Sequence, residues 1–468
     1  MLINLRFSAR PLPIAVSMLA LAAGADAQSL TQGASAPTTA APLQSLTYGV
    51  DAGVAHSDNV TLVPTDKVGQ TMAIADVDFD YKQQTRRLDA DAKGNFSYLD
   101  YLQNAYGNQL IGRFDGTARV ALIPERLIWV VQDDFGQSAL DPFTPTTPVN
   151  LENINYLSTG PDLHLRLGPA NFVDLSARYA RAQYETSPFN SNRLQGGVAA
   201  GRQLSAQSTL SVNADTERVM FANTALNVDF DRTNGYVRYA VQGARTDLSV
   251  DLGGTRIAQG DAATNGGLAK IELARKISPA ARLTFSAGRY LTDASTSFSG
   301  LQSGAIGVVG SAPAAVTADN YTANYVSAGW VYHRSRTTVA LSGRWEKDIY
   351  GAQPSLDRSL GGGELSIERR LTHSLTARLL GHIYKTDYVH AVVTPLSGSS
   401  NYDDDLIGAE LAWRHGRGLE VRFRAQHSSR VTAGIDNGYK ENRVMLTLGY
   451  RPKVGSSTSD PGADAPGP

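Results

Sequence analysis

The sequence contains no cysteine, carries a formal net charge of only −1, and has no long apolar run after its N-terminal region. Without cysteine there are neither disulfide bonds nor thiolate metal sites, so a large fold must be held by noncovalent pairing alone. The near-zero charge lacks the basic surface that nucleic-acid-binding proteins carry, and we expect no nucleic-acid partner. The absence of apolar runs of about 20 residues excludes transmembrane helices from the main part of the chain.

In the stretch from residue 73 to residue 122, apolar and polar side chains alternate. Side chains of a strand point to opposite faces with a period of 2, so each run has one apolar face and one charged face. A helix would not sort residues in this way. The apolar faces consist of Ala73, Ala75, Val77, Phe79 and Tyr81, then Leu88, Ala90, Ala92, Gly94, Phe96 and Tyr98, then Leu110, Gly112, Phe114, Gly116, Ala118, Val120 and Leu122.

These runs have the length of strands that cross a membrane. Each has about 10 residues or more, whereas strands of soluble sheets usually have about 5–6. A barrel hides its apolar side chains at every second position, which agrees with a mean hydropathy of −0.22. The sequence therefore predicts an all-β fold, a single transmembrane antiparallel β-barrel.

Similar segments continue to Tyr450 and predict roughly 20 strands, with a range of about 18–22. Short turns such as Pro124–Glu125 separate alternate pairs, and longer loops fall between the others, notably Gln137–Asn150, Ser295–Asp319 and Ala391–Asn401. This asymmetry is typical of barrels in the outer membrane of Gram-negative bacteria, with the short turns in the periplasm. We expect no helical segment within the barrel.

The two ends of the chain have a different composition from the barrel. Arg6 and Arg10 precede a short apolar segment, Leu12–Ala23, and a small-residue cleavage site follows, which predicts a secretory signal peptide at 1–27. Residues 28–45 are expected to be a flexible periplasmic lead-in and 452–468 a disordered tail, because both are rich in small and polar residues. The barrel is expected to span 46–451.

The charged faces of the strands predict a polar lumen. The candidate lumen-lining residues are Asp76, Asp78, Asp80, Asp89, Asp91, Arg113, Asp115, Arg119, Arg344, Arg378, His382, Arg422 and Arg424. Acidic residues predominate early and arginines late, and the first and last strands of a closed barrel are neighbours. Acids and bases are therefore expected to face each other across part of the lumen. The simpler interpretation is that they merely hydrate a wet interior; the functional one is a transverse field that orients a solute.

Two of the long loops attract attention. Gln137–Asn150 carries Pro142, Phe143, Pro145 and Pro148, and this semi-rigid composition predicts a loop that folds inward and narrows the pore. Ser295–Asp319 is unusually apolar for a surface loop. It is either mobile or packed against the lumen wall or a partner.

Short phrases in the chain carry a resemblance to a known family. They are Ser57–Val60, Asp141–Phe143 and Asn155–Pro161, set among repeated strands. With them the chain resembles the β-barrel porin type 2 group, in particular outer-membrane proteins associated with exopolysaccharide and exosortase gene clusters. The resemblance implies an outer-membrane location and a link to cell-surface polysaccharide, and it supplies no catalytic residues.

The sequence predicts a non-enzymatic, porin-like barrel that serves exopolysaccharide export or surface attachment. G-x-S-x-G and H-E-x-x-H are both absent, so we expect no catalytic residues, no metal site and no cofactor. The alternatives are a general diffusion porin, a structural or docking barrel and, with least support, an outer-membrane hydrolase. Expected partners are outer-membrane lipid and lipopolysaccharide, and beyond these exopolysaccharide and periplasmic export components; the oligomeric state is left open.

Overall fold

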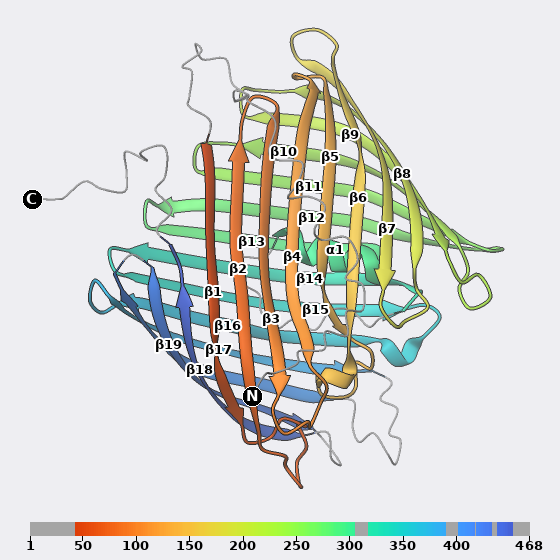
Figure 1. The fold of residues 1–468 in the computed structure, drawn as a ribbon. Coiled ribbons are helices and arrows are strands. Elements are labelled where there is room, and N and C mark those ends of the chain that lie inside the picture. The colour runs from red at the N-terminus through yellow and green to blue at the C-terminus, as the bar shows by residue number, and fades with distance from the viewer. Residues whose placement is uncertain (1–42, 305–316, 390–400, 417, 433–437, 453–468) are drawn as a thin grey trace, which may run out of the picture.

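The computed structural model of the protein describes residues 43–304, 317–389, 401–416, 418–432 and 438–452. These residues form a closed antiparallel barrel of 20 strands (Figure 1). Each strand pairs with its neighbours along the chain, and β1 closes the ring by pairing with β20 between Val50↔Tyr450 and Ser57↔Arg443. The predicted all-β barrel is confirmed, and the strand count agrees with the expected number.

The strands are 12 to 17 residues long. Their bounds are β1 Leu43–Ser57, β2 Gln70–Gln84, β3 Leu88–Tyr101, β4 Gln109–Ile123, β5 Leu127–Ala139, β6 Leu151–Arg166, β7 Asn171–Tyr184, β8 Ser191–Gln203, β9 Ser208–Phe221, β10 Phe230–Gln242, β11 Thr246–Gln259, β12 Ala262–Ser278, β13 Ala281–Asp293, β14 Asn320–Arg334, β15 Thr337–Tyr350, β16 Arg358–Arg370, β17 Leu375–Tyr388, β18 Tyr402–His415, β19 Leu419–Thr432 and β20 Tyr439–Tyr450.

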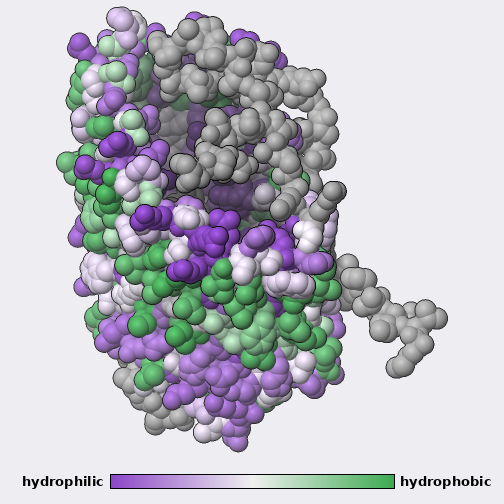
Figure 2. Space-filling model, turned by 90° about the vertical axis from the view of Figure 1, so that its left-hand side faces the viewer, coloured by the Kyte–Doolittle hydropathy of each residue, from purple (hydrophilic) through white to green (hydrophobic). Residues whose placement is uncertain are grey.

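Alternation along the strands gives the barrel an apolar outer wall. On β17 the outward positions run Leu375, Ala377, Leu379, Gly381 and Ile383, and Leu379 keeps 56% of its surface exposed. The same face continues onto β18 through the partners of these residues, such as Leu411 and Ile407. In Figure 2 hydrophobic residues gather across the middle of the visible face, between more hydrophilic regions. A band of this kind is the surface that a membrane-spanning barrel presents to lipid.

The two ends of the barrel differ in their connections. At one end, hereafter the short-turn end, a few residues join β2 to β3, β4 to β5 and each later pair in the same phase. β1 begins and β20 finishes at this end, as the even number of strands requires. The other end, hereafter the long-loop end, carries the connections 58–69, 140–150 and 294–319. No helix among the described residues is long and apolar enough to cross a membrane.

The ends of the chain are described only in part. The predicted signal peptide at 1–27 lies outside the described residues, as does the tail from residue 453. β1 starts at Leu43 and so includes the last residues of the predicted lead-in, 28–45.

The expectation that the barrel contains no helical segment is wrong. Ala294–Gly304 forms a helix, α1, directly after β13, and two short 3-10 turns lie at Pro148–Asn150 and Pro354–Leu356. The sequence of α1 is rich in serine and glycine, which are weak helix formers. Contacts with distant strands stabilise the helix instead. The rest of the predicted loop Ser295–Asp319 lies outside the described residues from 305 to 316.

The outer and inner faces of β17 can be tested by substitution. Leu379→Arg should lower the stability of the folded barrel by about 2–4 kcal/mol, because it places a charge near the middle of the apolar band. Arg378→Ala should fold normally, since Arg378 faces inward, its hydrogen-bonded partner Glu368 is 39% exposed, and its more distant partner Glu410 retains the guanidinium of Arg424. The measurement is the fraction of heat-modifiable protein on unboiled gels and the unfolding free energy in lipid vesicles. Equal effects of the two substitutions would show that the facing of β17 is wrong.

Candidate functional site

The candidate lumen-lining residues all occupy inward positions of their strands. Asp76 is adjacent to the outward-facing Val77 and therefore faces inward; its partners on the neighbouring strands are Asp51 and Ser97. By the same strand register, Asp89 and Arg119 also face inward. On the other side of the ring, a cavity of about 1410 Å³ is lined by four of the candidates, together with residues of β10–β19. These four are Arg344, Arg378, His382 and Arg424.

Among the described residues, the expected meeting of early acids and late arginines occurs only at the seam between β1 and β20. Arg451, the first residue after β20, donates to Asp51 Oδ2 and to Asp78 Oδ2, each at 2.7 Å. Arg422 approaches Asp51 at 3.9 Å. The charges of the first and last strands therefore join where the barrel closes.

The other late arginines are paired within their own part of the wall. Arg378 donates to Glu368 at 3.1 Å through Nε, and Arg424 donates to Glu410 at 2.8 Å. Arg344 donates to Glu346 at 2.7 Å. The broad separation of acidic and basic walls predicted from the sequence is thus reduced by local glutamates.

These glutamates were not among the residues predicted from the sequence. The signal for them was present, because Glu346 follows Arg344 by two positions and Glu420 precedes Arg422 by two. Two residues apart on a strand means the same face. Arg422 indeed donates to Glu420 at 2.7 Å. Several lumen arginines are therefore paired with glutamates of the same part of the wall.

The loop between β5 and β6 is a compact unit built around Asn150. The Asn150 side-chain amide donates to the Asp141 carbonyl at 2.9 Å, and its oxygen accepts from the Asp141 N–H at 2.8 Å. The Asp141 carboxylate accepts from the Phe143 N–H at 2.9 Å. These bonds and the 3-10 turn at Pro148–Asn150 fix the loop, and the prolines at 142, 145 and 148 restrict it further.

This loop reaches across the lumen. The ring of Phe143 lies 4.8 Å from that of Tyr388 on β17 and packs on a cluster of Tyr321, Tyr350 and Leu356. β14 to β17 stand on the opposite side of the ring from β5. Nearer its origin, the loop is held by Gln109, which donates to the Pro148 carbonyl at 3.2 Å.

A second segment, α1, also lies inside the ring (Figure 1). Phe298 of α1 is buried against Tyr156, Ala180 and Tyr184 on the inner faces of β6 and β7. Ser295 Oγ lies 2.7 Å from the Tyr184 hydroxyl, and Ser297 Oγ accepts from the Tyr321 hydroxyl at 2.6 Å. The helix therefore bridges the β6–β7 wall and the β14 wall.

A buried ionic cluster fixes the start of α1. Arg193 of β8, which is 1% exposed, donates to Asp293 Oδ1 at 2.6 Å and to Glu217 of β9 at 3.2 Å. Arg232 of β10 donates to Asp293 Oδ2 at 3.2 Å and also contacts Glu217. Two guanidinium groups thus balance two carboxylates, and the charge-assisted hydrogen bonds offset the cost of removing them from water.

Asp293 has a second role in this cluster, because it caps the helix. Its Oδ1 accepts from the Thr296 N–H at 3.2 Å, and its Oδ2 accepts from the Thr296 hydroxyl at 2.7 Å. A carboxylate at the beginning of a helix satisfies free N–H groups and interacts favourably with the helix dipole. One side chain therefore joins the wall to the helix.

The cavity lies between α1 and the short-turn end. Ser297 and Tyr321 line the part of the cavity nearer the long-loop end, and Arg282 and Thr338 line the part nearer the short-turn end. Tyr290, Tyr325 and Tyr384 also line it, and the Lys270 ammonium lies 4.2 Å from the centre of the Tyr290 ring. Phenol rings and mixed charges form a surface on which a hydrated solute can exchange hydrogen bonds.

The described residues contain no group of three or more His, Asp or Glu side chains arranged to hold a metal ion. His382 faces the cavity, with its ring 5.6 Å from that of Tyr384.

Comparison with known proteins identifies only distant structural similarities. No family model and no curated protein sequence matches the chain. Among solved structures, the apoprotein form of the FrpB iron transporter from Neisseria meningitidis (F5-1 variant) is similar at 11% identity and a TM-score of 0.46, covering 86% of this chain and 81% of that one. OccK2 (OpdF) from Pseudomonas aeruginosa is similar at 11% identity and a TM-score of 0.33, covering 87% and 98%. The copper transporter OprC is similar at 12% identity and a TM-score of 0.41, covering 87% and 83%. With TM-scores below 0.5, these similarities carry no argument about the fold, the substrate or the role of this chain.

Proposed function

We propose that the protein is a non-enzymatic, porin-like barrel of the outer membrane of a Gram-negative bacterium, and that a hydrated polymer, an exopolysaccharide, is its cargo. The observation that carries the proposal is the combination of a polar, tyrosine-lined cavity with two inward-folded segments at its long-loop end. The apolar outer band supports the membrane location.

The cavity suits a carbohydrate chain for a physical reason. A sugar polymer is hydrated and flexible, so its passage needs polar walls and aromatic faces without a deep well that would stall it. Tyr290, Tyr325 and Tyr384 provide such faces beside charged side chains, some of which are paired, such as Arg344 with Glu346 and Arg378 with Glu368. The choice of exopolysaccharide rests on this chemistry and on the resemblance of the loop phrases to outer-membrane proteins of exopolysaccharide clusters.

Two segments narrow the path in this proposal. The 140–150 loop, with Pro142, Phe143, Pro145 and Pro148, acts as the constriction, and α1 acts as the plug. Both are anchored by side chains rather than by strand pairing, so they are the parts of the lumen that can move while the wall stays intact. A general diffusion porin, or a barrel with a structural or docking role, remains the alternative if no polymer passes.

The constriction can be tested with a matched pair of substitutions in one loop. Phe143→Ala removes the contact with Tyr388, so the loop should lie less firmly across the lumen and single-channel conductance in planar bilayers should rise. Val149→Ala is the control, because Val149 is 73% exposed in the same loop. An unchanged conductance for Phe143→Ala, confirmed by replacing 141–149 with a glycine–serine linker, would remove the loop from the conduction path.

The anchor of α1 gives a second test. Asp293→Asn leaves two buried guanidinium groups short of one negative charge, which should cost about 3–5 kcal/mol of stability and raise the conductance by releasing α1. Glu441→Gln is the control, because this buried carboxylate binds Ser57, Ser428 and Arg443 away from the helix. If both variants lose stability and neither changes the conductance, α1 is not a plug.

The cargo is tested in the cell. Deletion of the gene should leave exopolysaccharide synthesised but retained in the periplasm, measured as polymer in the periplasmic and surface fractions. The Phe143→Ala variant should restore surface polymer, whereas a variant that does not assemble should not. Normal surface polymer in the deletion strain would reject export and leave the diffusion porin or the structural barrel.

A further inference from the structure

Basic residues recur at one height on the outer wall of the barrel. Six successive odd-numbered strands run from the short-turn end to the long-loop end, and each carries one outward-facing Arg or Lys immediately above its apolar positions. On β9, for example, Leu210, Val212, Ala214 and Thr216 lead to Arg218. The six residues are Arg181, Arg218, Arg256, Arg289, Lys347 and Lys385.

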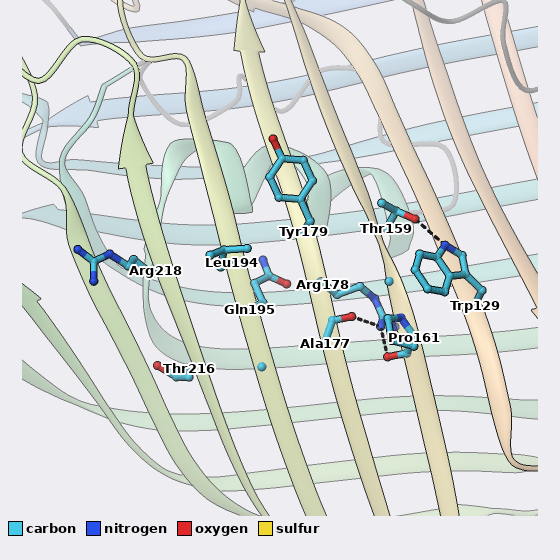
Figure 3. A pocket seen from close by; sticks show the side chains of 12 residues that line it. Trp129, Thr159, Pro161, Ala177, Arg178, Tyr179, Leu194, Gln195, Thr216 and Arg218 are labelled. Carbon is cyan, nitrogen blue, oxygen red and sulfur yellow. Dashed lines mark hydrogen bonds between the residues drawn. The ribbon is translucent and has the colours of Figure 1, made fainter.

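A groove in the outer wall lies directly beside part of this row (Figure 3). It has a volume of about 580 Å³ and runs over β5 to β9, from Trp129 to Arg218. Small residues form its floor, namely Gly160, Ala177 and Gly196. A Cβ added at Gly196 would meet no atom within 4 Å, so the space above this glycine is empty.

Away from Arg218 the lining of the groove is largely apolar, and two of its polar side chains are already bonded. The Trp129 indole N–H donates to Thr159 Oγ1 at 2.9 Å. Arg178 is neutralised by Asp162 at 2.7 Å and also donates to the Pro161 carbonyl. A mainly apolar groove in the outward-facing wall can hold an acyl chain.

Two outward-facing arginines carry free charge here: Arg218 lines the β9 end of the groove, and Arg181 lies on β7 two positions beyond Tyr179, another lining residue. Among the described residues neither Arg181 nor Arg218 forms an ion pair, although Asp231 lies opposite Arg218 on β10. Tyr179, a lining residue of the same strand as Arg181, donates its hydroxyl hydrogen bond to Asn192 at 2.8 Å. Arginine binds phosphate with two parallel hydrogen bonds, so this pair matches a phosphorylated head group.

We propose that this groove, with Arg181 and Arg218, binds a phosphorylated glycolipid of the outer leaflet. One acyl chain lies in the groove over Gly196, and a phosphate is held by the two arginines. The outer leaflet is chosen because the arginines lie toward the long-loop end, which faces the exterior when the short turns are periplasmic. The proposal concerns the outer wall and is independent of what passes through the lumen.

The test uses the full chain, purified in detergent and delipidated, with diphosphoryl lipid A as probe and native mass spectrometry as readout. Arg181→Gln/Arg218→Gln should weaken binding about tenfold or more, since two charge-assisted contacts are lost. The control is Arg202→Gln, because Arg202 lies on the outer face of β8 at the short-turn end. Equal weakening by Arg202→Gln would overturn the proposal by showing nonspecific attraction.

The acyl chain is tested separately. Gly196→Phe fills the groove and should abolish retention of lipid A, whereas Gly235→Phe should not. Gly235 is a fair control because it also faces outward, has no atom within 4 Å of an added Cβ, and lies outside the groove. Heat modifiability on gels establishes that each variant is folded.

Two further probes fix the chemistry of the ligand. Dephosphorylated lipid A should bind at least tenfold more weakly than the diphosphoryl form, and phosphatidylglycerol should not displace it. Equal binding of the dephosphorylated probe would refute phosphate recognition. Displacement by phosphatidylglycerol at equal concentration would refute the glycolipid as the occupant.

Discussion

The structure depends on the pairing of every strand edge with another strand of the same chain. Backbone N–H and C=O groups cannot be left without partners in the apolar interior of a membrane, and a closed ring is the only sheet without free edges. In this chain the requirement is met by the ladder between β1 and β20, where Arg451 joins Asp51 and Asp78 across the seam. Side chains at the seam therefore strengthen the place where sequence distance is greatest.

Once the ring is closed, the two faces of each strand can serve different ends. The outer face is mostly apolar across the middle of the strands, with basic residues toward the long-loop end. The inner face is heterogeneous: paired charges and tyrosines border the cavity, while buried aromatic clusters and an ionic cluster fill the long-loop end. This division places the rigid, redundant interactions in the wall and the few specific ones in the lumen.

The strands of the wall could be predicted from the sequence, whereas α1, which lies inside the ring, could not. Alternation is a property of neighbouring residues, so Ala73–Tyr81 or Leu375–Ile383 reveal their strands and their facing directly. The plug depends on contacts between residues that are far apart in the chain, such as Arg193 and Asp293, separated by 100 positions. Phe143 could be singled out by its proline neighbours, whereas α1 has no helical signal of its own and owes its form to Asp293 and Phe298.

The end of β13 determines how firmly the start of α1 is held to the wall. Its ladder with β12 stops at Ala269↔Arg289, but its ladder with β14 continues to Asp293↔Asn320. The last four residues of β13 are therefore hydrogen-bonded to a neighbouring strand on one edge only, and α1 begins directly after them. A displacement of α1 would therefore have to separate only these four residues from β14. The ring would stay closed, because the pairing of β12 with β11 does not involve them.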